Sequence, residues 1–140
     1  MHFEIAIQAP KETVWKILWE DRTLRQWAGI IDPGTYMLGE LEEGKEVQFN
    51  SEEGYGVTSF VEKLIPNEYV LLKHMADTKD YGNDDREDQW IGGNESYTLN
   101  ETDGVTALKL QFDVPEELEV AMSMSYPKAL NKVKELSEKF

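Results

Sequence analysis

The sequence has no cysteine, two histidines and few basic residues, and each scarcity excludes a class of function. Without cysteine there is no disulfide bond, thiolate zinc site or cysteine nucleophile. The same absence is compatible with a reducing compartment, so we expect a cytoplasmic protein. Lysine and arginine number 14 against 28 aspartates and glutamates, which gives a formal net charge of -14. This excess repels phosphate backbones and anionic lipid surfaces, so we expect neither nucleic-acid binding nor membrane insertion.

Long hydrophobic runs are also missing from the chain. No apolar run approaches the ~20 residues that a membrane-spanning helix needs. The first strand-like pattern begins at His2, which leaves no room for a signal peptide, so we expect none. What the sequence does contain is 140 residues, of which 40% are hydrophobic and 30% charged. That balance is typical of a globular protein, and we predict a single domain over residues 1–140.

The first quarter of the chain predicts one strand followed by two short helices. Residues 2–8 alternate apolar and polar side chains, as a half-buried strand does. Pro10 suits the first turn of a helix, where a missing N–H costs nothing. Asp21 is predicted to cap a second helix, which Gly29 is expected to end.

From residue 32 onward the pattern predicts a meander of strands. Turn signals recur roughly every ten residues, and the runs between them are rich in aromatic and β-branched residues. Such short connections favour antiparallel pairing. The polar run 77–89 is predicted to be a loop, and Gly92-Gly93 a bulge or a kink in the next strand. The expected strands cover residues 35–40, 45–50, 55–65, 68–75, 95–101 and 105–113.

The last quarter predicts one long helix over residues 116–138. Pro127 lies inside the pattern and is expected to kink the helix, because it removes a hydrogen bond and clashes with the preceding turn. A helix of this kind can bury its apolar stripe only against the concave face of a curved sheet. We therefore predict an α+β fold with an antiparallel sheet wrapped around the C-terminal helix. The stripe consists of Leu118, Met122, Ala129, Leu130, Val133 and Leu136.

Several short motifs together resemble one known family. They are I-x-A-P-x-E-x-V-W-x-I-L from residue 7, L-x-x-W at 24–27, Y-G-V at 55–57 and T-A-L-K-L at 106–110. With the long final helix, this set resembles the START-like (SRPBCC) superfamily, and within it the AHSA-type branch named for the activator of a heat-shock chaperone ATPase. The resemblance implies a helix-grip, pollen-allergen-like fold with a cavity between sheet and helix. It also implies binding of hydrophobic molecules, polyketide cyclisation, or stimulation of the chaperone.

Each aromatic residue could either pack in the hydrophobic core or line a ligand pocket. Trp15 and Trp19 are spaced i, i+4 and are predicted to pack the helices against the sheet. Trp27 fits either the core or the rim of a pocket, and the strand aromatics fit either as well. Alternation breaks within residues 55–64, so the inward face there stays open. The candidate ligand-binding residues are Trp27, Tyr36, Phe49, Tyr55, Val57, His74, Tyr97, Leu110, Met122 and Tyr126.

These patterns favour non-catalytic binding of a small hydrophobic or amphipathic molecule, lipid-like or polyketide-like, without a cofactor. One alternative is a cyclase or dehydratase, which needs an inward-facing acid or base such as His74; a structural histidine is the other reading of this residue. A second alternative is a module that regulates a chaperone ATPase through its outer surface. No nucleophile-elbow motif occurs, and residues 77–88 lack the spacing of a calcium loop, so we expect no catalytic triad and no metal site.

Overall fold

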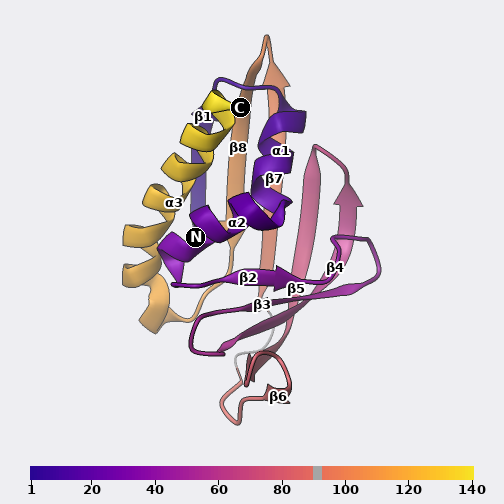
Figure 1. Cartoon of the computed structure of the whole chain (residues 1–140), viewed down its shortest axis with the longest axis vertical. Helices are drawn as coiled ribbons and strands as arrows, with labels where there is room; N and C mark the ends of the chain where they lie inside the picture. The colour runs from indigo at the N-terminus through magenta and orange to yellow at the C-terminus, as the bar shows by residue number, and fades with distance from the viewer. Residues whose placement is uncertain (90–92) are drawn as a thin grey trace.

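The computed structural model describes residues 1–89 and 93–140 as a curled antiparallel sheet with helices on one side (Figure 1). The elements in chain order are β1 (His2–Ile7), α1 (Lys11–Trp19), α2 (Asp21–Ile31), β2 (Tyr36–Leu38), β3 (Glu46–Asn50), β4 (Gly56–Ile65), β5 (Tyr69–Lys79), β6 (Asp84–Asp85), β7 (Asn94–Thr102), β8 (Val105–Phe112), the 3-10 helix η1 (Glu116–Leu118) and α3 (Glu119–Lys139).

The sheet runs in the order β1-β8-β7-β5-β4-β3-β2, with the short β6 paired to the far end of β5. Every pairing between neighbouring strands is antiparallel. The sheet curls into a half-barrel, and α3 packs against β1, α1 and α2. The predicted α+β helix-grip architecture is therefore confirmed.

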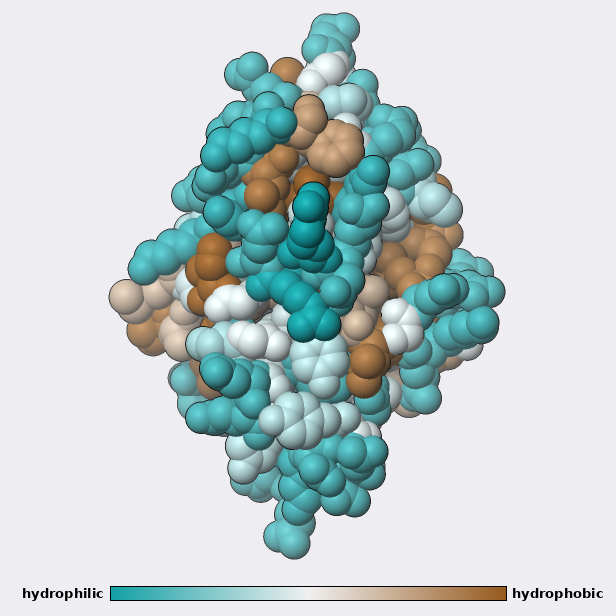
Figure 2. Space-filling model, in the orientation of Figure 1, coloured by the Kyte–Doolittle hydropathy of each residue, from teal (hydrophilic) through white to brown (hydrophobic). Residues whose placement is uncertain are grey.

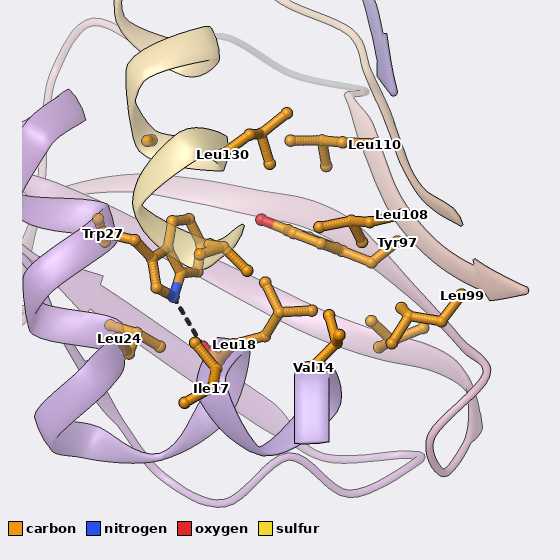
Figure 3. Packing of buried hydrophobic residues seen from close by; sticks show 14 of the residues in the cluster. Val14, Ile17, Leu18, Leu24, Trp27, Tyr97, Leu99, Leu108, Leu110 and Leu130 are labelled. Atoms are coloured by element: carbon orange, nitrogen blue, oxygen red, sulfur yellow. Dashed lines mark hydrogen bonds between the residues drawn. The ribbon is translucent and has the colours of Figure 1, made fainter. Parts of the chain in front are cut away.

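The core lies between the helices and the inner face of β7 and β8. In the register of these strands, Tyr97 lies opposite Leu110 and Leu99 opposite Leu108. All four side chains are at most 3% exposed, and Leu130 of α3 faces Leu110 from the other side (Figure 3). Each such leucine contributes on the order of 1.5–3 kcal/mol through burial. Figure 3 shows the tight cluster that results.

The predicted boundaries of α2 are wrong at both ends. Asp21 is the first helical residue, and Glu20 occupies the N-cap without a side-chain hydrogen bond. The buried Thr23 hydroxyl instead donates to the Ile17 carbonyl oxygen at 2.6 Å, which ties α2 to α1. The helix also continues through Gly29 to Ile31, because glycine tolerates helical angles and Ile31 packs against the core.

The polar run 77–89 is only partly a loop. β5 continues to Lys79, and β6 pairs with it through Thr78 and Asp85. This hairpin was not predicted, since backbone pairing needs no apolar side chains. Asp80 and Tyr81 make its turn with φ angles of 53° and 54°. The irregularity predicted at Gly92-Gly93 stays a prediction, because Gly92 lies outside the described residues.

Two register shifts interrupt the pairing of β4 with β5. They fall between Thr58 and Ser59 and between Val61 and Lys63. An extra residue in a strand shifts the side chains that follow to the opposite face, which explains why alternation fails in this stretch. Ser59 and Val61, which lie between the two shifts, share the inner face and are buried, whereas after the second shift Leu64 packs against the core.

The apolar stripe of the C-terminal helix is buried only in its second half. Pro127 lies inside α3, which continues unbroken to Lys139, and Ala129 and Val133 are fully buried. Leu118, predicted to be buried, is 42% exposed. Figure 2 shows hydrophobic surface at the left edge, where Figure 1 places the first turns of α3. The stripe emerges here because the space beneath it is a pocket rather than filled core.

Candidate functional site

A pocket of about 630 Å³ opens between the sheet and the first turns of α3. Strands β4, β5 and β7, the end of β8 and the segment after it, η1 and α3 all contribute to its walls. Its apolar lining is formed by Val57, Leu72, Phe112, Val114, Pro115, Leu118, Met122 and Tyr126. Its charged and titratable lining is formed by His74, Asp77, Arg86, Asp88, Glu95, Asp113 and Glu117.

Glu95 is the carboxyl group that β7 contributes to this lining. It lies on the inner face of β7, two residues before the core residue Tyr97, and pairs with Leu72 on β5 and Phe112 on β8. Burial raises the pKa of Glu95 to about 7, although a hydrogen bond from the Tyr97 hydroxyl opposes this rise. A carboxyl group with such a pKa exchanges its proton near neutral pH.

Two tyrosines surround the Glu95 carboxyl group. Burial, and secondly the nearby Glu95 charge, raises the pKa of Tyr97 and of Tyr126 well above the ordinary range. Both phenols therefore keep their protons. The Tyr126 ring is held by Phe112 at 4.6 Å and Phe3 at 5.5 Å between ring centroids. This stacking anchors the middle of α3 to the edge of the sheet.

A histidine–aspartate pair faces the same pocket from β5. The His74 Nε2 atom lies 3.2 Å from Oδ1 of Asp77, and the two side chains are 12% and 16% exposed. The His74 backbone N–H donates to the carbonyl oxygen of Gly93. His74 is thus a diagonal cross-strand neighbour of Glu95, at a typical Cα separation of roughly 7–8 Å. The pocket therefore contains an inward-facing titratable cluster.

The structure brings some of the candidate residues together and separates others. Val57, His74, Met122 and Tyr126 line the pocket, and Tyr97 reaches it only through Glu95. Trp27, which the sequence left open between core and rim, lies in the core. It is 4% exposed, and its indole N–H donates to the Leu18 carbonyl oxygen at 3.1 Å. Figure 3 shows Trp27 and Tyr97 reaching this core from α2 and from the sheet.

The remaining candidates do not line the pocket. Leu110 is fully buried in the core, and Phe49 is half-buried against it. Tyr36 lies under the Arg25 guanidinium, 5.0 Å from its ring centroid. Tyr55 is 49% exposed and stacks with Arg86 at 5.2 Å.

Trp15 and Trp19 pack against the core as partly buried residues. Their outer edges line a second, shallower hollow of about 420 Å³ beside Met37 and Leu41. The tryptophans of α1 are therefore closer to the surface than Trp27.

Glu95 is a candidate site residue that the sequence analysis did not single out. Its signal was present, because Glu95, Tyr97 and Leu99 alternate on one face of the predicted strand. A carboxylate in line with buried residues points inward, and that position marks a functional candidate.

Comparison with known proteins places the chain in a family. Residues 8–136 match the family model described as "Activator of Hsp90 ATPase homolog 1-like protein". The chain belongs to this family. A search of curated proteins gave no significant match.

Solved structures share the fold at low sequence identity. The Aha1 dimer from Colwellia psychrerythraea is 20% identical with a TM-score of 0.74, and the match covers 99% of this chain and 95% of that one. Protein MLL2253 from Mesorhizobium loti is 14% identical with a TM-score of 0.70, covering 99% and 98%. CalU16 from Micromonospora echinospora is 14% identical with a TM-score of 0.68, covering 97% and 74%. Similarity at this level shows the fold alone.

Outside residues 90–92, no helix combines the length and hydrophobicity that crossing a membrane requires. The same described residues contain no group of three or more histidine, aspartate or glutamate side chains arranged to hold a metal ion.

Proposed function

We propose that this protein binds a small amphipathic molecule in the pocket between the sheet and the first turns of α3. We also propose that the chain is a single domain and that the protein is cytoplasmic. The observation that supports this most strongly is the composition of the pocket wall. Phe112, Leu118 and Met122 offer apolar contact, whereas Glu95 and the His74–Asp77 pair offer polar partners. Pockets of a few hundred Å³ with mostly apolar walls and a few convergent polar groups are typical ligand sites.

An exposed apolar residue of the pocket wall supports the same proposal. Leu118 lines the pocket and is 42% exposed. Leaving apolar surface in water costs free energy, at roughly 25 cal/mol per Å². A bound molecule that covers Leu118 recovers part of this energy on binding.

A second candidate function is acid–base catalysis of the cyclase or dehydratase type. The observation that favours it is the inward titratable cluster, since Glu95 has a pKa of about 7 and the His74–Asp77 pair lies diagonally across from it. A general base of this kind would remove a proton next to a substrate carbonyl, with a neutral tyrosine hydroxyl donating to the developing oxyanion.

Ligand binding is tested by NMR with a panel of fatty acids, sterols, polyphenols and aromatic amines. A pocket ligand should shift the methyl resonances of Met122 and Leu72, whereas the core residue Leu99 should stay unchanged. It should also raise the melting temperature, because it stabilises only the folded state. A panel without any such shift would contradict the proposal and favour the chaperone-regulating alternative, tested next by pull-down of a heat-shock ATPase.

Binding and catalysis are then separated with Glu95→Gln. If the pocket only binds, product analysis by mass spectrometry should show no turnover of any bound panel member by the parent protein. If it catalyses proton transfer, the parent should convert a carbonyl-containing member, and Glu95→Gln should bind it without converting it.

A further inference from the structure

The charges around the pocket are unequal. Five carboxylates line it, whereas Arg86 is the only arginine or lysine among the described lining residues. Over the whole chain the ratio of acidic to basic residues is 28 to 14, so the pocket is more acidic than the composition explains. Arg86 also stacks on Tyr55 at 5.2 Å, outside the pocket lining. The carboxylates are Asp77, Asp88, Glu95, Asp113 and Glu117.

The partners of these carboxylates leave negative charge inside the pocket. Asp113 accepts a hydrogen bond from the Asn94 backbone N–H at 3.1 Å. Glu95 accepts one from the Tyr97 hydroxyl. Both partners are uncharged. Asp77 pairs with His74, whose Nε2 atom lies 3.2 Å from it. Within residues 1–89 and 93–140, no lysine or arginine forms an ion pair with Asp88, Glu95, Asp113 or Glu117.

We propose that the ligand is a cationic amphipathic molecule, an aromatic or aliphatic body with a protonated amine. The amine lies against the Glu95 carboxylate on the pocket floor, and the apolar body lies between Phe112, Met122 and Leu118. This inference rests on the proposed function, because it assigns a chemical class to the ligand of the same pocket.

The electrostatics of the pocket select this class. An opposite charge stabilises a carboxylate in a half-buried site far more than it stabilises a carboxylate in water. The reason is that less water surrounds the buried pair to screen the attraction. An ammonium group supplies both the charge and three hydrogen-bond donors. A fatty acid would place its own carboxylate among Glu95, Asp113 and Asp77, and this repulsion opposes its binding.

The apolar geometry suits a compact aromatic body. Phe112 and Tyr126 are stacked with a centroid distance of 4.6 Å, and both line the pocket. Met122 adds a flexible thioether that adapts to aromatic rings. A flat aromatic amine therefore meets ring and sulfur contacts on one side and Glu95 on the other.

The test uses probes that share one apolar body: naphthylethylamine, naphthylethanol and naphthylacetic acid. Their dissociation constants are measured by calorimetry near pH 8, where Glu95 is ionised and the amine protonated. We expect the amine to bind about tenfold more tightly than the alcohol, and the acid to bind most weakly.

Variants assign the preference to the pocket rather than to the net charge. Glu95→Gln should reduce the affinity for the amine to that for the alcohol and leave the alcohol unchanged. Glu62→Gln, which removes the same charge from an exposed position of β4, should change neither affinity. Asp113→Asn provides a second pocket variant if Glu95→Gln does not fold, with an expected loss of about threefold for the amine.

The outcomes separate the two proposals. Binding of alcohol and amine with equal affinity, unaffected by Glu95→Gln, would overturn the cationic ligand class and leave the binding pocket in place. A preference for the acid would also overturn it. An absence of binding by all three probes and by the NMR panel would overturn both proposals. An equal loss of amine affinity in Glu62→Gln would show attraction to net charge alone and overturn the role of Glu95.

Discussion

The Tyr97 hydroxyl donates a hydrogen bond to the Glu95 carboxyl group, two residues earlier on the same inner face of β7. Tyr97 belongs to the hydrophobic core, whereas Glu95 lines the pocket. One strand therefore passes from structural core to candidate site within three residues, and the hydrogen bond joins the two regions. We therefore expect changes in the charge of Glu95 to affect both the stability of the fold and the proposed ligand binding.

Glu95 should make the stability of the fold depend on pH. Its pKa is raised from 4.5 to about 7 by burial, so the folded state favours the neutral carboxyl group. This contribution is fully present below the unfolded pKa and is lost as the pH rises through the folded pKa. We expect Glu95→Gln, which is neutral at every pH, to exceed the parent in unfolding free energy near pH 8 by on the order of 2 kcal/mol.

Urea unfolding of both proteins across this pH window measures the difference directly. Groups other than Glu95 titrate equally in the two proteins, so they cancel when one curve is subtracted from the other. A difference that stays constant from acidic to alkaline pH would show that burial does not perturb Glu95.

Met122 and Met124 form a matched pair for testing the pocket. Met122 lines it, whereas Met124 is 65% exposed and is not part of the lining. Met122→Gln should weaken binding of a pocket ligand by about tenfold, because a polar amide replaces an apolar contact. Met124→Gln should leave the affinity within about twofold. Calorimetric titration of both variants with one ligand decides the point, and equal losses would move the site away from the described pocket.

Trp27 should matter for stability more than Trp15 does. Trp27 is 4% exposed and hydrogen-bonded to Leu18, whereas Trp15 lies at the surface of α1 and is only partly buried. Trp27→Ala should cost about 3–5 kcal/mol, the usual loss for a buried aromatic, and Trp15→Ala clearly less. Denaturant titration of both variants measures the loss in unfolding free energy. A larger loss in Trp15→Ala would contradict the assignment of Trp27 as the more important core residue.

Two glycines should respond to alanine in opposite directions. Gly29 lies inside α2 with no atom near the position of an added Cβ, so Gly29→Ala should stabilise the protein by about 0.5–1 kcal/mol. At Gly56 an added Cβ would overlap the Phe49 carbonyl oxygen across the β3–β4 pair. Gly56→Ala should therefore lower the melting temperature strongly. Thermal unfolding monitored by circular dichroism tests both variants. An unchanged melting temperature for Gly56→Ala would mean that the backbone of β3 shifts away from the added Cβ at little cost.

Most of the fold could be predicted from the sequence, because the spacing of apolar residues along the chain decides the type of each helix and strand. Alternation predicted β1, and helical spacing predicted the long C-terminal helix, since each residue's face follows from the period of its element. Short turns between the strand-like runs indicated an antiparallel sheet. The boundaries of α2 and the β5–β6 hairpin were misjudged, because hydrogen bonds such as Thr23 to Ile17 decide them.

The pocket depends on contacts between residues distant in the chain. Met122 and His74 could be proposed from the sequence, yet Trp27 and Leu110 fitted the same pattern and lie in the core. Glu95 becomes a candidate only when β5, β8 and α3 surround it and remove part of its water. The sequence therefore determined the elements and their apolar faces. Only the tertiary structure decided which inward residues are packed and which face an open space, because that depends on where α3 stops covering the sheet.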